Sequence, residues 1–133
     1  MKRILLLEDE NLVMNLVIRI LKPRPISQAR TATEALQLFA TDGAEINLMI
    51  ADVTLPVGSG VQVATALRVL NPYLAIILIS GYPVSRWSER DTGCLRDLGL
   101  QFLSILQKPF RPQALRRGVE ELIGPYEIEA ATA

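Results

Sequence analysis

The stretch INLMIADVTLP, residues 46–56, decides the fold. Its first six residues are nearly all apolar and do not alternate with polar ones, which is typical of a strand buried on both faces of a parallel sheet. Asp52 follows this apolar run directly. The stretch therefore predicts a buried parallel strand with a carboxylate where it ends.

Similar apolar runs on both sides of this stretch predict further strands, at residues 4–7, 74–79 and 102–106. The polar segment 26–30 is also predicted as a strand, because its place in the alternation demands one. Helical spacing and capping residues predict helices at about 12–21, between Thr31 or Thr33 and Gly43, at 60–70, and from Pro112 to Gly124.

Two of the helices carry more detailed expectations. The stripe that the first helix is expected to bury consists of Leu12, Val13, Leu16, Val17, Ile20 and Leu21. Residues 83–93 contain Pro83, Gly93 and many polar side chains, so a fourth helix here is expected to be short, displaced or mobile. Strands that alternate with helices predict an α/β fold, a doubly wound five-stranded parallel sheet with helices on both faces.

The composition limits the domain organisation and the chemistry. The 133 residues suffice for one compact domain, predicted at 1–124, with a short C-terminal tail at 125–133. The 14 basic and 14 acidic residues cancel, so no global charge favours nucleic acid or an anionic membrane. With no histidine and only Cys94, the chain cannot form an internal disulfide, a histidine-ligated metal site or a Ser-His or Cys-His nucleophile. We expect a cytoplasmic protein without membrane spans.

Five reactive side chains follow four of the predicted strands. They are Glu8, Asp9, Asp52, Ser80 and Lys108. The carboxyl ends of parallel strands meet at one edge of the sheet, so these side chains are expected to form one acidic pocket with a lysine and a hydroxyl. Three crowded carboxylates repel one another and favour a divalent cation, Mg²⁺ or Mn²⁺. A carboxylate beside a cation and a lysine suits attack on a phosphoryl group, to whose oxygens Ser80 can donate a hydrogen bond.

Each motif alone also has an ordinary structural explanation. Glu8 to Glu10 can complement the dipole of the first helix, and Asp52 can belong to the turn before Pro56. Ser80 and Lys108 can be simple loop and strand-exit residues. Their joint position at the exits predicted for a single site favours the phosphoacceptor pocket.

Four short segments resemble the motifs of response regulator receiver domains, in the same order along the chain. They are ILLLEDE at 4–10, DVTLP at 52–56 with Gly60 beyond it, ILISGY at 77–82 and KPF at 108–110. The resemblance covers about residues 2–123 and is nearest to receivers of hybrid kinases or stand-alone receivers. It implies a flavodoxin-like sheet with strand order 2-1-3-4-5.

The resemblance also implies roles for individual residues. Asp52 is the implied phosphorylation site, and the implied metal ligands are Glu8, Asp9, Asp52 and the backbone carbonyl of Thr54. Ser80 and Lys108 are implied phosphate-binding and switch residues. Thr54 and Tyr82 are implied to tune dephosphorylation, and the bond between Lys108 and Pro109 to be cis. The chain departs from the family at Ile105, where an aromatic switch residue is usual.

The expected partners are a histidine kinase or a histidine phosphotransfer protein as phosphoryl donor. Downstream, we expect a protein partner or self-association through the 83–123 face, to which Trp87 and Arg116 can contribute. Trp87 taken by itself fits a partly buried packing residue better than a partner anchor. The chain is then not an enzyme beyond its own phosphorylation and dephosphorylation. Two alternatives stay open: a degenerate receiver that docks without phosphorylation, and a small Mg²⁺-dependent aspartyl-phosphate phosphohydrolase. The second would need another aspartate where Thr54 stands.

Overall fold

A single parallel sheet organises the computed structural model, which describes residues 2–126. Its strands are β1 (Arg3–Leu7), β2 (Ile26–Ala29), β3 (Ile46–Asp52), β4 (Ala75–Ser80) and β5 (Leu103–Gln107). They lie in the order β2-β1-β3-β4-β5, and every neighbouring pair is parallel. The predicted fold class, including the polar strand β2, is therefore confirmed.

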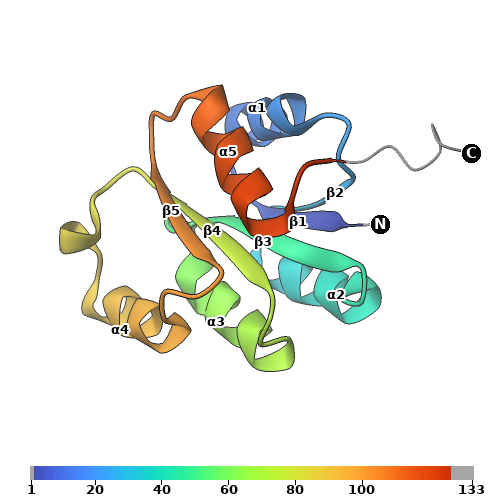
Figure 1. The fold of residues 1–133 in the computed structure, drawn as a ribbon. Helices are drawn as coiled ribbons and strands as arrows, with labels where there is room; N and C mark the ends of the chain where they lie inside the picture. Colours follow the sequence, from blue (N-terminus) through green and yellow to red (C-terminus); the bar gives the residue numbers. More distant parts are fainter. Residues whose placement is uncertain (1, 127–133) are drawn as a thin grey trace, which may run out of the picture.

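Five α-helices and one 3₁₀ turn connect the strands. They are α1 (Asn11–Leu21), α2 (Ala32–Asp42), α3 (Gly60–Leu70), η1 (Val84–Arg86), α4 (Glu89–Leu98) and α5 (Pro112–Ile123). Figure 1 shows α1 and α5 on one face of the sheet and α2, α3 and α4 on the other. Each face has its own buried apolar cluster, which is why the inner strands β1, β3 and β4 are apolar on both sides.

Serine and threonine caps fix where three helices begin. The hydroxyls of Thr31, Ser59 and Ser88 accept hydrogen bonds from backbone N–H groups in the first turns of α2, α3 and α4. Such caps satisfy N–H groups that have no partner within the helix. The caps therefore set the length of the loops that approach the carboxyl edge of the sheet.

The expected apolar stripe of α1 is only partly correct. The buried residues are Met14, Val17, Ile20 and Leu21. Leu12 is 84% exposed and Leu16 is 43% exposed, so both lie outside the helix face that packs on the sheet. The positions 14, 17 and 21 follow a helical spacing of three and four residues, and that spacing defines the inner face.

The fourth helix, which was expected to be short, displaced or mobile, is shorter than each of the other four α-helices by one or two residues. The α4 helix has ten residues, although Gly93 lies within it. Ser88 caps it by accepting a hydrogen bond from the Asp91 N–H at 3.1 Å. The Asp91 carboxylate, which is buried, accepts a hydrogen bond of 2.6 Å from the Ser59 hydroxyl at the start of α3. These two anchors compensate for the poor helix propensity of the segment.

Two further features bear on the sequence predictions. Within residues 2–126, no helix is long and apolar enough to cross a membrane. Residues 127–133 of the predicted C-terminal tail lie outside the described part of the chain.

Candidate functional site

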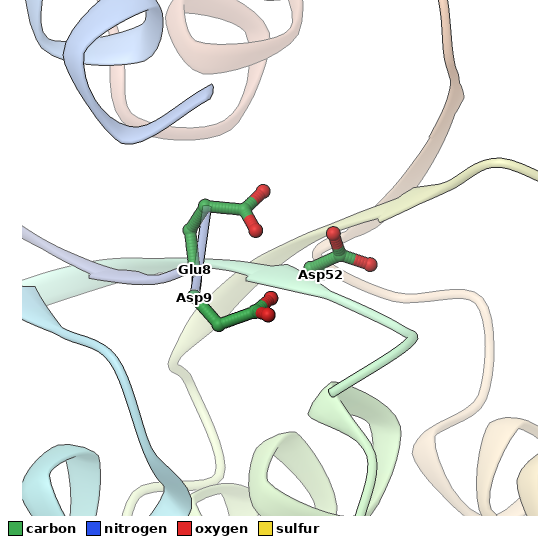
Figure 2. A group of neighbouring side chains, drawn as sticks. All are labelled: Glu8, Asp9 and Asp52. Carbon is green, nitrogen blue, oxygen red and sulfur yellow. The ribbon is translucent and has the colours of Figure 1, made fainter. Parts of the chain in front are cut away.

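Three carboxylates meet at the carboxyl edge of the sheet, as the sequence predicted. Glu8 and Asp9 follow β1, and Asp52 is the last residue of β3. One oxygen from each carboxylate lies within 4.8 Å of the other two (Figure 2). β1 and β3 are adjacent parallel strands, so residues 44 positions apart in sequence end side by side.

This acidic cluster borders an open cavity of about 510 Å³. The cavity is lined by Asp9, Glu10, Asp52, Thr54, Leu55, Pro56, Gly81, Tyr82 and Lys108. Glu8 and Asp52 are almost fully buried, at 2% and 4% exposed, whereas Asp9 is half-buried. Oxygen donors of this kind, beside a space open to water, suit a hard divalent cation such as Mg²⁺.

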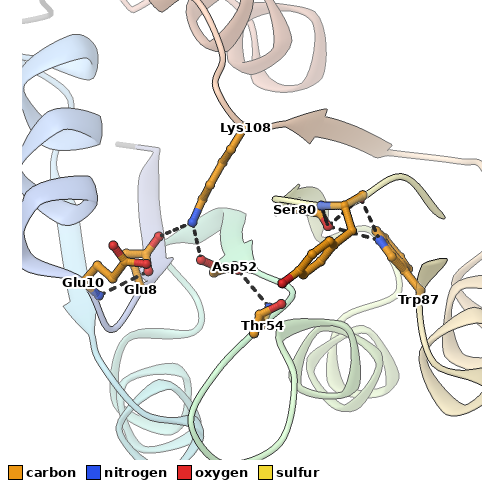
Figure 3. Close-up of polar contacts among 8 residues, drawn as sticks. Glu8, Glu10, Asp52, Thr54, Ser80, Trp87 and Lys108 are labelled. Carbon is orange, nitrogen blue, oxygen red and sulfur yellow. Dashed lines mark hydrogen bonds and ion pairs between the residues drawn. The ribbon is translucent and has the colours of Figure 1, made fainter. Parts of the chain in front are cut away.

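Lys108 supplies the positive charge of the cluster. Its ammonium nitrogen lies 2.6 Å from Asp52 Oδ2 and 3.7 Å from Glu8 Oε1 (Figure 3). Lys108 follows β5, and its backbone N–H donates to the Ser80 carbonyl at 2.8 Å, which holds this strand exit against the end of β4. The bond between Lys108 and Pro109 is cis, as the resemblance implied.

The shared environment changes the acid–base properties of the cluster. Burial and the neighbouring charge of Asp52 raise the pKa of Glu8 to about 7, against opposing effects of the Glu10 N–H and Lys108. Burial by itself would lower the pKa of Lys108, but the hydrogen bond and charge of Asp52, followed by the charges of Glu8 and Glu10, raise it overall. Glu8 therefore takes up a proton readily, while Lys108 stays charged.

The backbone around Asp52 is tightly packed. Asp52 Oδ1 accepts a hydrogen bond of 2.8 Å from the Thr54 N–H. A Cβ atom placed on Gly60 would lie 2.1 Å from the Asp52 carbonyl oxygen, a distance that real contacts do not reach. Only glycine allows the start of α3 to approach β3 this closely, and that approach fixes where Asp52 stands.

Ser80 ends β4 and is 1% exposed. Its hydroxyl is engaged with its own loop: it donates to the Tyr82 carbonyl at 2.7 Å and accepts from the Tyr82 N–H at 3.0 Å. Within residues 2–126, no hydrogen bond joins Ser80 Oγ to Asp52. Of the predicted site residues, Glu8, Asp9, Asp52 and Lys108 form one cluster, Thr54 and Tyr82 line the cavity, and Ser80 is turned away.

Two residues near the site were not predicted from the sequence. Glu10 lines the cavity, and its N–H donates to Glu8 Oε2 at 3.2 Å. The sequence feature that could have indicated Glu10 is its place in the acidic run of residues 8–10. Trp87 Nε1 donates to Ser80 Oγ at 3.1 Å (Figure 3), and nothing in the sequence indicates this pairing.

The structure decides between the two interpretations of Trp87 on the 83–123 face. Trp87 is 9% exposed and packs in the core cluster between the sheet and α2, α3 and α4, so it is not available as a surface anchor. Arg116 is exposed on α5. Ile105, on β5, is 38% exposed, and the aromatic ring beside Ser80 comes from Trp87 instead.

This chain is similar in sequence to known bacterial proteins. The sensor kinase CckA of Brucella abortus (strain 2308) is 27% identical over 122 residues, which cover 90% of this chain and 12% of that protein. The regulatory protein VanR of Enterococcus faecium is 31% identical over 127 residues, which cover 94% of this chain and 51% of that protein. The chain thus spans about half the length of VanR and a small part of CckA.

A solved structure shares the fold over nearly its whole length. It is the signal receiver domain of an HD domain-containing protein from Pseudomonas fluorescens Pf-5, with a TM-score of 0.78, 25% sequence identity, and coverage of 92% of this chain and 94% of that chain. A family model described as the response regulator receiver domain matches residues 4–120, which include all the predicted site residues. The chain therefore belongs to the response regulator receiver domain family of two-component systems.

Proposed function

We propose that this chain accepts a phosphoryl group on Asp52 from a phosphohistidine donor and signals through the change in shape that follows. The observation that carries the proposal is the arrangement around one carboxylate. Asp52 stands at an open cavity, shares an acidic cluster with Glu8 and Asp9, and has the Lys108 ammonium 2.6 Å from one of its oxygens.

In the proposed step, an Asp52 oxygen forms a bond to phosphorus while the P–N bond to the donor imidazole breaks. The electron pair of the broken bond goes to the imidazole nitrogen. Lys108 neutralises charge on the attacking carboxylate and then on the transferred phosphoryl oxygens. The Thr54 N–H, which donates to Asp52 Oδ1, holds the carboxylate so that its other oxygen meets the donor.

The residues that would hold Mg²⁺ are Glu8, Asp9 and Asp52, together with the Thr54 carbonyl. When bound, the cation supplies Lewis-acid neutralisation of the phosphoryl oxygens. The crowding of three carboxylates supports this assignment, since burial and the charge of Asp52 raise the pKa of Glu8 to about 7. Such a cluster becomes stable with all groups ionised when a cation joins it.

Receiver domains are signalling domains that interact with histidine kinases and with downstream partners. For this chain we propose a histidine kinase or histidine phosphotransfer protein as donor, and the 83–123 face as the output surface. Tyr82, which is 54% exposed at the cavity, and Thr54 are proposed to control the access of hydrolytic water. The domain is proposed to occupy residues 1–124.

The test is incubation with acetyl phosphate and Mg²⁺, followed by intact mass measurement. We expect the mass of one added phosphoryl group in the wild type and none in Asp52→Asn, which keeps the shape of the side chain without its charge. Glu45→Gln, a substitution at an exposed carboxylate away from the cluster, is the matched control and should be phosphorylated normally. No added mass in the wild type would indicate a docking module that works without phosphorylation, and steady turnover of small phosphoesters would indicate a phosphohydrolase.

A further inference from the structure

The Ser80 hydroxyl has no hydrogen-bonding capacity left. A hydroxyl offers one proton and two lone pairs. The proton goes to the Tyr82 carbonyl, and the oxygen accepts from the Tyr82 N–H and from Trp87 Nε1. Because Ser80 is 1% exposed, water cannot easily replace these partners. Ser80 can therefore donate to a phosphoryl group on Asp52 only by leaving the Tyr82 carbonyl.

Trp87 is placed so that this departure leaves the Tyr82 carbonyl and the indole paired, while the N–H of Tyr82, a residue that is 54% exposed, loses Ser80 Oγ as its acceptor. Its Nε1–H is shared between Ser80 Oγ at 3.1 Å and the Tyr82 carbonyl at 3.2 Å. When the Ser80 hydroxyl turns away, the Tyr82 carbonyl loses one donor and keeps the indole. The indole in turn keeps an acceptor. An unpaired buried donor or acceptor is costly, so this exchange of partners lowers the barrier between two positions of Ser80.

The same indole is connected to the start of α4. Trp87 directly precedes Ser88, whose hydroxyl caps α4 by accepting from the Asp91 N–H. The Asp91 carboxylate is hydrogen bonded to Ser59, which caps α3. The ring packs in the core cluster that contains Leu98 and against which the partly buried Val84 packs. In the sequence, Val84 precedes the Ser88 cap and Leu98 follows it. A shift of the ring toward Tyr82 therefore acts on the first turn of α4.

We propose that Trp87 is the positioning residue that couples Ser80 to α4. In the unphosphorylated protein the indole N–H holds the Ser80 hydroxyl in its loop. On phosphorylation Ser80 turns to the phosphoryl oxygens, the indole N–H passes to the Tyr82 carbonyl, and the first turn of α4 loosens. This inference rests on the proposed phosphorylation of Asp52 and adds the route by which the signal leaves the site.

The inference can be tested directly because Trp87 is the only tryptophan of the chain. Tryptophan emission and intact mass are measured in the same samples during incubation with acetyl phosphate and Mg²⁺. We expect the emission to change in proportion to the phosphorylated fraction. Mg²⁺ without acetyl phosphate, and Asp52→Asn with both, control for effects of the cation and the reagent. Added mass with unchanged emission refutes the coupling and leaves the proposed function intact, whereas no added mass refutes both.

Two variants separate a coupling role from simple packing. In Ser80→Ala, compared at equal phosphorylated fraction, the emission should not change. In Trp87→Phe, which keeps a ring but lacks the N–H, phosphorylation should still occur. In the wild type, phosphorylation should make hydrogen exchange of the Asp91 and Thr92 amides faster. In Trp87→Phe, most of this increase should be absent. A full response in Trp87→Phe contradicts the proposal, even if Ser80→Ala does not take up a phosphoryl group.

Discussion

Lys108 Nζ lies 2.6 Å from Asp52 Oδ2, although the two residues are 56 positions apart in the sequence. The lysine thus contacts the carboxylate that we propose as phosphoacceptor, from the exit of a different strand. It neutralises Asp52 within a cluster that also holds Glu8 and Asp9. The ion pair places a cation where negative charge would develop during phosphoryl transfer.

Replacement of Lys108 should therefore slow phosphorylation. Lys108→Met keeps the apolar stem and removes the charge. Loss of one well-placed electrostatic group of this kind lowers a rate by about 100-fold. The measurement is the initial rate of mass gain with acetyl phosphate and Mg²⁺, with the exposed Lys22→Met as control. A rate in Lys108→Met equal to that of the control would contradict the role of the ion pair.

The raised pKa of Glu8 predicts how stability depends on pH in the presence of a chelator. In the folded protein Glu8 keeps its proton up to a pKa of about 7, whereas in the unfolded chain it releases the proton near the ordinary pKa of 4.5. The folded state thus binds more protons in this window, and the free energy of unfolding falls as pH rises from about 4.5 to 7 and then levels off. Thermal unfolding between pH 5.5 and 8 measures this trend.

The matched variant for this pH prediction is Glu8→Gln, which does not titrate. The fall in stability between pH 5.5 and 7 should be smaller in Glu8→Gln than in the wild type. Addition of Mg²⁺ should stabilise the wild type more at pH 8 than at pH 5.5, because the cation binds the ionised carboxylates. Identical pH profiles of the variant and the wild type would show that Glu8 does not titrate in this range.

Gly60 predicts a steric effect at the site. In Gly60→Ala the added methyl group would lie 2.1 Å from the Asp52 carbonyl oxygen, so β3 and α3 must move apart. We expect a loss of about 1–3 kcal/mol in the free energy of unfolding, as for other overpacked positions. Urea denaturation measures it. The control is Gly93→Ala in α4, where no atom lies within 4 Å and alanine should stabilise by about 0.5–1 kcal/mol.

The hydrogen bond between Ser59 and Asp91 predicts a difference between two helix caps. Ser59→Ala removes the cap of α3 and also leaves the buried Asp91 carboxylate without its partner, which should cost about 2–3 kcal/mol. Ser88→Ala removes an exposed cap alone and should cost about 1 kcal/mol. If urea denaturation gave the same loss in the free energy of unfolding for Ser59→Ala and Ser88→Ala, the hydrogen bond between Ser59 and Asp91 would add no stability.

The sequence by itself determined the alternation of strands and helices, and with it the predicted fold. Apolar runs without polar alternation, such as residues 46–51, require burial on both faces, and only a sheet covered by helices on both sides provides it. The same reasoning placed Glu8, Asp9, Asp52 and Lys108 at one edge, because parallel strands all end on the same side. These predictions depend on local pattern and topology alone.

The tertiary structure decided features that depend on contacts between distant segments. It made α4 a full helix, because Ser59 lies where it can bond to Asp91, and it left Leu12 and Leu16 exposed by setting which face of α1 meets the sheet. It also turned the Ser80 hydroxyl toward Trp87. Hydrogen bonds of this kind need donor and acceptor atoms about 3 Å apart, within a tolerance of a few tenths of an ångström, and no periodicity in the sequence records such positions.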